Sequence, residues 1–521
     1  MNERIQVLLS STVVVLLALF AFLAFQNIDV GAENIEQIQV FNLDEGAGTW
    51  QLKQNVLNRD FEPRGFYNYG YLYLNLTHLF VKVAGGLGYD SSDEQFLCIC
   101  LRLASLISWL FLGIWTFLSC RNLKMRTYFS LLAAASIMLL PKVFEYAQFA
   151  HPDLLQMNLI AMGIFFLSRP QTRLLDISFS CLIFGLAFGT KYSGVFLLPL
   201  PFLMLLHQLR KGQMSLRSAL LFGALGLVLF VGAWIASNPY VLSEWAAFAE
   251  DFKYESEHVS RGHWRAESAN PLIWFNVIWS QFGPVLSFAL LSAVILLFYF
   301  RTETRSESKL FVTLMLITMV IGLLYLMVQV NMRRPRYLFH LLPLMIIPGF
   351  YFLDKFQRLV KAKTVFLFLL PIVLIAPAAK SFDIYEGYSK KMEHEYIRAG
   401  EWMVKNYPGH IKILSDYYSY LPPEHFNNAY HTFGITASEI AGHQPQVIIL
   451  NESISGMRSW KKEGTSFNEG KIIATDRDGA EELNQFHQML FSNNSGWKVV
   501  YEEVNIVILE KELIQSQAGA E

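Results

Sequence analysis

The sequence predicts a mainly α-helical polytopic membrane protein with a small extramembrane α/β domain at its C-terminal end. Hydrophobic residues make up 53% of the 521 residues, and charged residues only 16%. The apolar residues form runs long enough to cross about 30 Å of hydrocarbon, which excludes an ordinary soluble enzyme. After Lys380 the composition changes to a soluble mixture. We therefore expect a membrane domain over residues 1–380 and a soluble domain over residues 381–521.

About 11 apolar runs are expected to be transmembrane helices. The first, residues 5–25, is longer than the apolar core of about 7 to 15 residues in a cleaved signal peptide, so we expect it to stay as a span. The other expected spans cover residues 96–118, 128–144, 154–167, 174–188, 195–209, 220–236, 285–300, 311–328, 337–353 and 365–379.

A further apolar segment, residues 69–84, is interrupted by Asn75, His78 and Lys82. If this segment lies at the interface instead of crossing, the short basic loops all fall on one side of the membrane, which the positive-inside rule makes the cytoplasmic side. These loops cover residues 121–126, 169–173, 210–217, 301–309 and 355–363. We therefore expect a cytoplasmic N-terminus and an outer C-terminal domain.

The first outer loop, residues 27–95, carries the adjacent carboxylates Asp44 and Glu45. They are candidates for acid–base chemistry or substrate binding, although acidic residues also stabilise the start of a helix. Tyr67 in the same loop is a candidate sugar or headgroup contact, and an interfacial aromatic belt explains it equally well.

Two further outer turns contain ionisable residues. Asp153 follows His151 and Pro152, a pattern that also commonly begins a helix. Lys191 and Tyr192 lie between two spans, where a lysine can simply extend its side chain to the interface. These residues are therefore candidate site residues whose structural alternatives remain open.

Three arginines, Arg333, Arg334 and Arg336, oppose the charge bias of the outer face. A guanidinium group stays charged and contacts two phosphate oxygens at once, so the cluster indicates a phosphate at headgroup level. Binding of ordinary anionic membrane lipid is the alternative.

Cofactor signals are weak. His151, Asp153 and Glu45 could hold a divalent cation, but no spacing rule singles them out, and the sequence contains no zinc-type spacing, Walker loop or dinucleotide fingerprint. The four cysteines lie in or beside apolar runs, so we expect no disulfide framework. We expect no nucleic-acid partner.

The order of these motifs resembles that of a known family. An outer Asp-Glu pair follows the first span, a second outer Asp comes later, and GTKYSG and RRPRYLFHLLP follow in turn. Over residues 1–380 this pattern is similar to the dolichyl-phosphate-mannose protein mannosyltransferases and their bacterial relatives, which include the aminoarabinose transferase of lipid A. The resemblance implies the class C glycosyltransferase (GT-C) fold and a bacterial or archaeal plasma membrane.

The resemblance also implies an activity, namely transfer of a sugar from a polyprenyl-phosphate carrier, with inversion, to an acceptor on the outer face. Asp44 and Asp153 match the family's catalytic acids, and Lys191 and Arg336 match the groups that hold the carrier's phosphate. The large luminal insert of the eukaryotic members is absent, and the acceptor, whether lipid, glycan or protein, stays open.

Two other functions fit the sequence less well. A transporter or flippase places ionisable groups near the bilayer midplane, often in two matching halves, whereas the charges here gather at one rim. A plain membrane anchor for the C-terminal domain needs neither eleven spans nor the outer acids. The glycosyltransferase is therefore favoured.

The C-terminal domain is expected to alternate helices and strands. Helical periodicity covers residues 393–406 and 481–491, and strand-like runs cover residues 411–414, 446–450 and 497–509.

Overall fold

A computed structural model describes residues 3–64, 67–170, 172–261, 271–299, 307–359, 363–432, 435–451, 485–492 and 495–512. The chain divides into two compact units. The first contains Met1–Asp29, Gln51–Ser256 and Asn270–Tyr388, and the second contains Val30–Trp50, Glu257–Ala269 and Ser389–Glu521. Each unit is described by itself.

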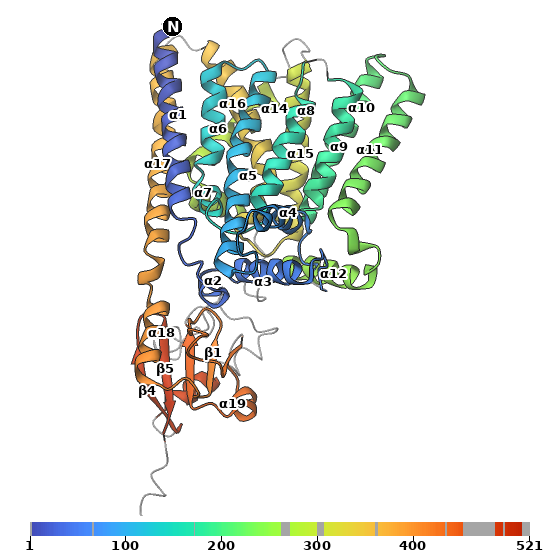
Figure 1. Cartoon of the computed structure of the whole chain (residues 1–521). Coiled ribbons are helices and arrows are strands. Elements are labelled where there is room, and N and C mark those ends of the chain that lie inside the picture. Colours follow the sequence, from blue (N-terminus) through green and yellow to red (C-terminus); the bar gives the residue numbers. More distant parts are fainter. Residues whose placement is uncertain are drawn as a thin grey trace, which may run out of the picture. The chain divides into compact units, whose positions relative to one another are not determined.

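The first unit is a bundle of helices, in which α5, α8, α9 and α11 stand side by side (Figure 1). Its α-helices are α1 (Glu3–Gln26), α4 (Leu72–Gly86), α5 (Glu94–Asn122), α6 (Thr127–Met138), α7 (Pro141–Tyr146), α8 (Asp153–Leu167), α9 (Leu174–Phe188), α10 (Pro199–Arg210), α11 (Leu216–Ser237), α13 (Ile273–Val277), α14 (Pro284–Tyr299), α15 (Glu307–Gln329), α16 (Leu342–Leu359) and α17 (Lys363–Ser389). Short helices η1 (Tyr192–Leu197), η2 (Pro239–Val241), η3 (Ile278–Phe282) and η4 (Pro335–Leu341) connect them. Two more helices, α3 (Leu43–Asn58) and α12 (Trp245–Arg261), contribute residues to both units.

Six described helical segments are long and apolar enough to cross a membrane, which makes this an integral membrane protein. They are Gln6–Gln26, Glu94–Asn122, Tyr192–Arg210, Leu216–Ser237, Ser308–Gln329 and Pro335–Arg358, and three shorter apolar helices are α6, α8 and α9. The predicted spans 285–300 and 365–379 coincide with α14 and α17, some of whose side chains lie outside the described residues. The doubtful segment 69–84 forms most of α4, which is not among the six.

The predicted span 128–144 is broken into α6 and α7. The break precedes Pro141, where Leu140 has a ψ of 126° that is not helical. A proline ring clashes with a helical residue in front of it, so the chain leaves the helix there and begins a new one at the proline. Side chains link the bundle across such breaks, as when Nε1 of the buried Trp109 donates to the Met138 carbonyl at 2.9 Å.

The second unit is built on a five-stranded sheet in the order β2-β1-β3-β5-β4. Its strands are β1 (Ile413–Asp416), β2 (Ala429–Thr432), β3 (Val447–Asn451), β4 (Trp497–Glu502) and β5 (Ile506–Lys511). β1 lies parallel to β2 and β3, whereas β5 is antiparallel to β3 and β4. The single run predicted over residues 497–509 is a hairpin of two strands, and the predicted helix 393–406 is α18 (Glu395–Asn406). The predicted helix 481–491 begins outside the described residues.

A short helix from the segment predicted to be the first outer loop, α2 (Ile35–Phe41), belongs to the core of this second unit. Val40 is 3% exposed and shares a hydrophobic cluster with Ile397 and Met403 of α18. The Phe41 ring meets the His394 ring edge-on, with centroids 6.2 Å apart, and the Lys391 ammonium lies 4.9 Å from the Phe41 centroid. The compact unit therefore extends beyond residues 381–521 to the segment that leads into Asp44.

Candidate active site

A buried ion pair between Asp153 and Lys191 is the centre of the site in the first unit. Lys191 Nζ lies 2.6 Å from Asp153 Oδ1, and the two side chains are 10% and 1% exposed. The pair follows from the chain path, because α8 begins at Asp153 and α9 returns antiparallel to end three residues before Lys191. The two motifs that the sequence placed on outer turns thus meet directly.

His151 connects this pair to Arg336. Its Nδ1 lies 2.9 Å from Asp153 Oδ2 but 3.4 Å from the Asp153 backbone nitrogen, so the shorter contact assigns the Nδ1 proton to a hydrogen bond with the carboxylate. Nε2 then accepts, and it lies 3.4 Å from Nη1 of Arg336. The imidazole ring therefore links the carboxylate to the guanidinium.

Arg336 is held at the site by η4, a 3₁₀ helix that begins with Pro335. The following residue, Tyr337, has its ring centroid 5.8 Å from the Arg336 guanidinium carbon and 5.5 Å from Lys191 Nζ. Tyr69 lies 5.5 Å from the same ammonium and also contacts the His151 ring. Aromatic faces thus stabilise both cations.

Two side chains that the sequence reasoning missed support the cluster. Gln156 Nε2 donates to the Lys191 carbonyl at 2.6 Å, and Ser105 Oγ donates to the His151 carbonyl at 3.2 Å. Gln156 follows Asp153 by three residues on α8, a spacing that places both on one helix face and could have identified it. Ser105 carries no comparable signal in the sequence.

A close backbone contact holds Tyr69 beside Lys191. The Leu72 backbone N–H donates to the Gly189 carbonyl at 3.2 Å. A Cβ atom added to Gly70 would lie 2.1 Å from the same carbonyl oxygen, so only glycine fits there.

The predicted contacts Tyr67 and Tyr192 hold this region together. Tyr192 Oη donates to the carbonyls of Tyr67 at 2.8 Å and Tyr69 at 3.2 Å. Tyr67 is buried, and its hydroxyl donates to Glu244 Oε2 at 2.9 Å. Burial and the Glu244 carboxylate raise the pKa of Tyr67, so its phenol stays protonated as a donor.

The remaining predicted arginines differ in exposure. Arg333 is buried and its Nη2 lies 3.5 Å from Asn331 Oδ1, whereas Arg334 is exposed.

Asp44 and Glu45 lie in the first turn of α3, within the second unit. The Asn42 side-chain oxygen accepts from the backbone N–H groups of Asp44 at 3.1 Å and Glu45 at 3.4 Å, which caps the start of the helix. The Glu45 side chain is buried. Convergence of these acids with Asp153 stays a prediction.

The cluster in the first unit suits an anion better than a cation. Two cationic side chains, Lys191 and Arg336, gather here around the single carboxylate of Asp153, an arrangement that can hold an anion such as a phosphate. Both Asp153 oxygens face nitrogen atoms. Within the described ranges no three or more His, Cys, Asp or Glu side chains form a group that could hold a metal ion.

No protein-family model and no curated protein sequence matches this chain, but solved structures do. ArnT from Cupriavidus metallidurans bound to undecaprenyl phosphate matches over 97% of this chain and 99% of its own, with a TM-score of 0.53 at 12% identity. The Archaeoglobus fulgidus oligosaccharyltransferase in complex with Zn and sulfate matches over 94% and 79%, with a TM-score of 0.52 at 11% identity. Both are class C glycosyltransferases. This chain has the GT-C fold. The fold predicted from the motif order is thereby confirmed, and GT-C architecture extends over nearly the whole chain.

Proposed function

We propose that the protein is a glycosyltransferase that moves a sugar from a polyprenyl-phosphate carrier to an acceptor on the outer face, with inversion at the anomeric carbon. The observation that carries the proposal is the cluster on a GT-C fold in which the buried pair of Asp153 and Lys191 is joined through His151 to Arg336. Among the similar structures, ArnT is bound to undecaprenyl phosphate, and the archaeal oligosaccharyltransferase AglB is in complex with a dolichol-phosphate.

Lys191 and Arg336 are assigned to the leaving phosphate. As the bond between the anomeric carbon and the phosphate oxygen breaks, negative charge grows on the phosphate, and two cations in a water-poor site stabilise it by several kcal/mol. The guanidinium adds a planar two-point contact.

Asp44 is assigned as the general base. It would take the proton of the acceptor hydroxyl while that oxygen attacks the anomeric carbon from the side opposite the phosphate, which inverts the configuration. Such a base contributes on the order of a hundred- to ten-thousand-fold. Asn42 supports this role because it fixes the helix turn that carries Asp44.

Asp153 is assigned to positioning, because its oxygens are already engaged by Lys191 and His151. It fixes the position of the Lys191 ammonium group and of the His151 imidazole, which faces Arg336. The other predicted substrate contacts are proposed to surround the donor, and they are Glu45, Tyr67, Tyr192, Arg333 and Arg334.

The test is transfer of labelled sugar from a panel of polyprenyl-phosphate donors by purified protein in detergent, where there is no second leaflet. We expect the wild type to transfer the sugar. Arg336→Lys should lower transfer at least tenfold, because an ammonium cannot reproduce the two-point contact. Lys191→Ala should lower transfer further. Both variants should lower transfer more than donor binding.

The matched control is Arg398→Lys, an exposed arginine paired with Glu503 in the second unit, which should leave transfer unchanged. A wild type that is inert with every donor and acceptor, yet moves such lipids between the leaflets of liposomes, would overturn the enzyme in favour of a flippase.

A further inference from the structure

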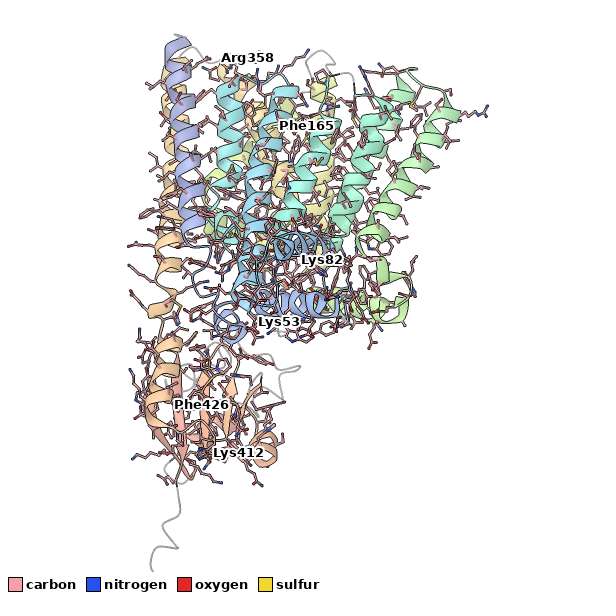
Figure 2. The ribbon with its side chains drawn as sticks, in the orientation of Figure 1. Lys53, Lys82, Phe165, Arg358, Lys412 and Phe426 are labelled. Carbon is pink, nitrogen blue, oxygen red and sulfur yellow. The ribbon has the colours of Figure 1, made fainter. Side chains whose placement is uncertain are left out.

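A cavity of about 520 Å³ lies at the end of the first unit opposite the Asp153 cluster. It is bounded by Leu167 at the last turn of α8, roughly 20 Å along that helix from Asp153. The other walls come from the α5–α6 and α8–α9 connections and from α10, α15 and α16. Figure 2 shows this end of the bundle around the labelled Phe165 and Arg358. The positive-inside rule predicts that it faces the cytoplasm.

The lining of this cavity is strongly cationic. Lys124, Arg169, Arg173 and Lys355 all line it, together with His207, and no Asp or Glu is among the described lining residues. Four like charges around one space repel one another unless each is paired or an anion lies among them.

Only part of this charge is neutralised by the protein. Arg169 Nη1 pairs with Asp176 Oδ1 at 2.8 Å. Within the part of the chain that the structure describes, Lys124, Arg173 and Lys355 form no ion pair with an Asp or Glu, since the nearby Asp354 is engaged by Arg126 and Arg358. The cavity therefore keeps a surplus of positive charge.

The rest of the lining combines apolar side chains with the uncharged polar residues Ser168, Thr172, Gln208, Gln213 and Ser308. Leu123, Leu167, Met204, Phe311 and Tyr351 contribute to the walls between the cations. A cavity of this volume whose wall is partly apolar and carries several charged groups is typical of a small-molecule site, and this combination matches an amphiphile with an anionic head.

We propose that this cavity binds the phosphate of an anionic phospholipid from the leaflet at this end of the bundle. The cations contact the phosphate oxygens, and the apolar walls contact the first part of the acyl chains. The site is separate from the proposed donor site and does not depend on the proposed function.

The test is native mass spectrometry of the full-length protein with phosphatidylglycerol or phosphatidylcholine, combined with thermal unfolding in the same lipids. We expect phosphatidylglycerol to be retained at concentrations at least tenfold lower than phosphatidylcholine. The double variant Lys124→Ala, Arg173→Ala should lose about tenfold in phosphatidylglycerol binding. The charge-conserving pair Lys124→Arg, Arg173→Lys should keep it, which separates charge from folding.

The matched control removes two exposed cations of the same basic face that do not line the cavity, in the double variant Arg210→Ala, Arg217→Ala. It should change binding less than twofold. Equal losses in the two alanine variants would overturn the proposal, because binding would then reflect only the general charge of this face. Inorganic phosphate that protects the protein as well as the phospholipid does would overturn the lipid as the ligand, since the phosphate alone would account for binding.

Discussion

Lys191 Nζ lies 2.6 Å from Asp153 Oδ1, and both side chains are almost completely shielded from solvent. Removing one member of such a pair leaves the other charge buried without its partner, which costs about 3–5 kcal/mol. We therefore expect Asp153→Asn to lower the melting temperature in detergent strongly, and the added change Lys191→Met to recover part of the loss.

An ion pair that is only partly buried gives the matched comparison. Lys53 Nζ lies 2.6 Å from Glu94 Oε1, but these side chains are 29% and 23% exposed. Glu94→Gln should therefore cost less than about 1 kcal/mol. A similar change in melting temperature for Asp153→Asn and Glu94→Gln would contradict the buried character of the first pair.

Asp44→Asn tests the proposed base. Asparagine keeps the shape of the side chain and removes its basicity, so we expect transfer to fall at least a hundredfold while donor binding and melting temperature stay near wild type. Glu36→Gln in α2 is the control and should retain transfer. Turnover retained in Asp44→Asn would mean that Asp44 only stabilises the first turn of α3, and it would make Glu45 or Asp153 the next candidate for the base.

Gly70→Ala tests the backbone contact that holds Tyr69 near Lys191. The new methyl group would overlap the Gly189 carbonyl oxygen, and because that atom belongs to the backbone, the chain itself must move. We expect transfer to fall at least tenfold, since misplacement by about 1 Å can cost a hundredfold. Gly86→Ala, where a Cβ meets nothing within 4 Å, should behave as wild type in the same assay.

The predicted sidedness can be checked with single engineered cysteines. The native cysteines Cys98, Cys100, Cys120 and Cys181 are buried, so their background labelling should be low. In intact cells a membrane-impermeant thiol reagent should label Glu424→Cys in the C-terminal domain and should not reach Arg217→Cys. If both positions are labelled in intact cells, or if neither is labelled until the cells are lysed, the two positions lie on the same side. The predicted number of spans between them would then be wrong.

Much of the fold follows from local patterns in the sequence. Apolar runs identified the long helices, and the fully buried run of β3 identified a central strand. β2 was not predicted, because its Ala-Tyr-His-Thr segment is short and partly exposed. An edge strand of this kind carries no clear hydrophobic periodicity. The hairpin of β4 and β5 was read as one strand because both halves are rich in β-branched residues and the turn between them lacks glycine and proline.

The sequence could predict which site residues lie on the same side of the membrane. It could not predict the contacts that depend on packing between distant parts of the chain. Asp153 and Lys191 occupy corresponding ends of two antiparallel helices, so alternate loops were enough to bring them together. The sequence favoured a Lys191 side chain that simply extends to the membrane interface. In the structure this side chain is instead buried against Asp153. Ser105 donates to a backbone carbonyl from a distant helix, and such a contact has no signature in the sequence, whereas Gln156 could have been found from its spacing after Asp153.

The position of α2 has a consequence for how the protein can be divided. Val40 and Phe41 pack with residues that follow them by some 350 positions, so the core of the C-terminal unit is incomplete without the segment that contains α2. A fragment that begins at residue 389 would expose the apolar surface that Val40 and Phe41 cover. A hybrid in which the C-terminal domain comes from another GT-C protein would also have to take its counterpart of residues 35–42 from that protein, because this segment and the domain share one hydrophobic core.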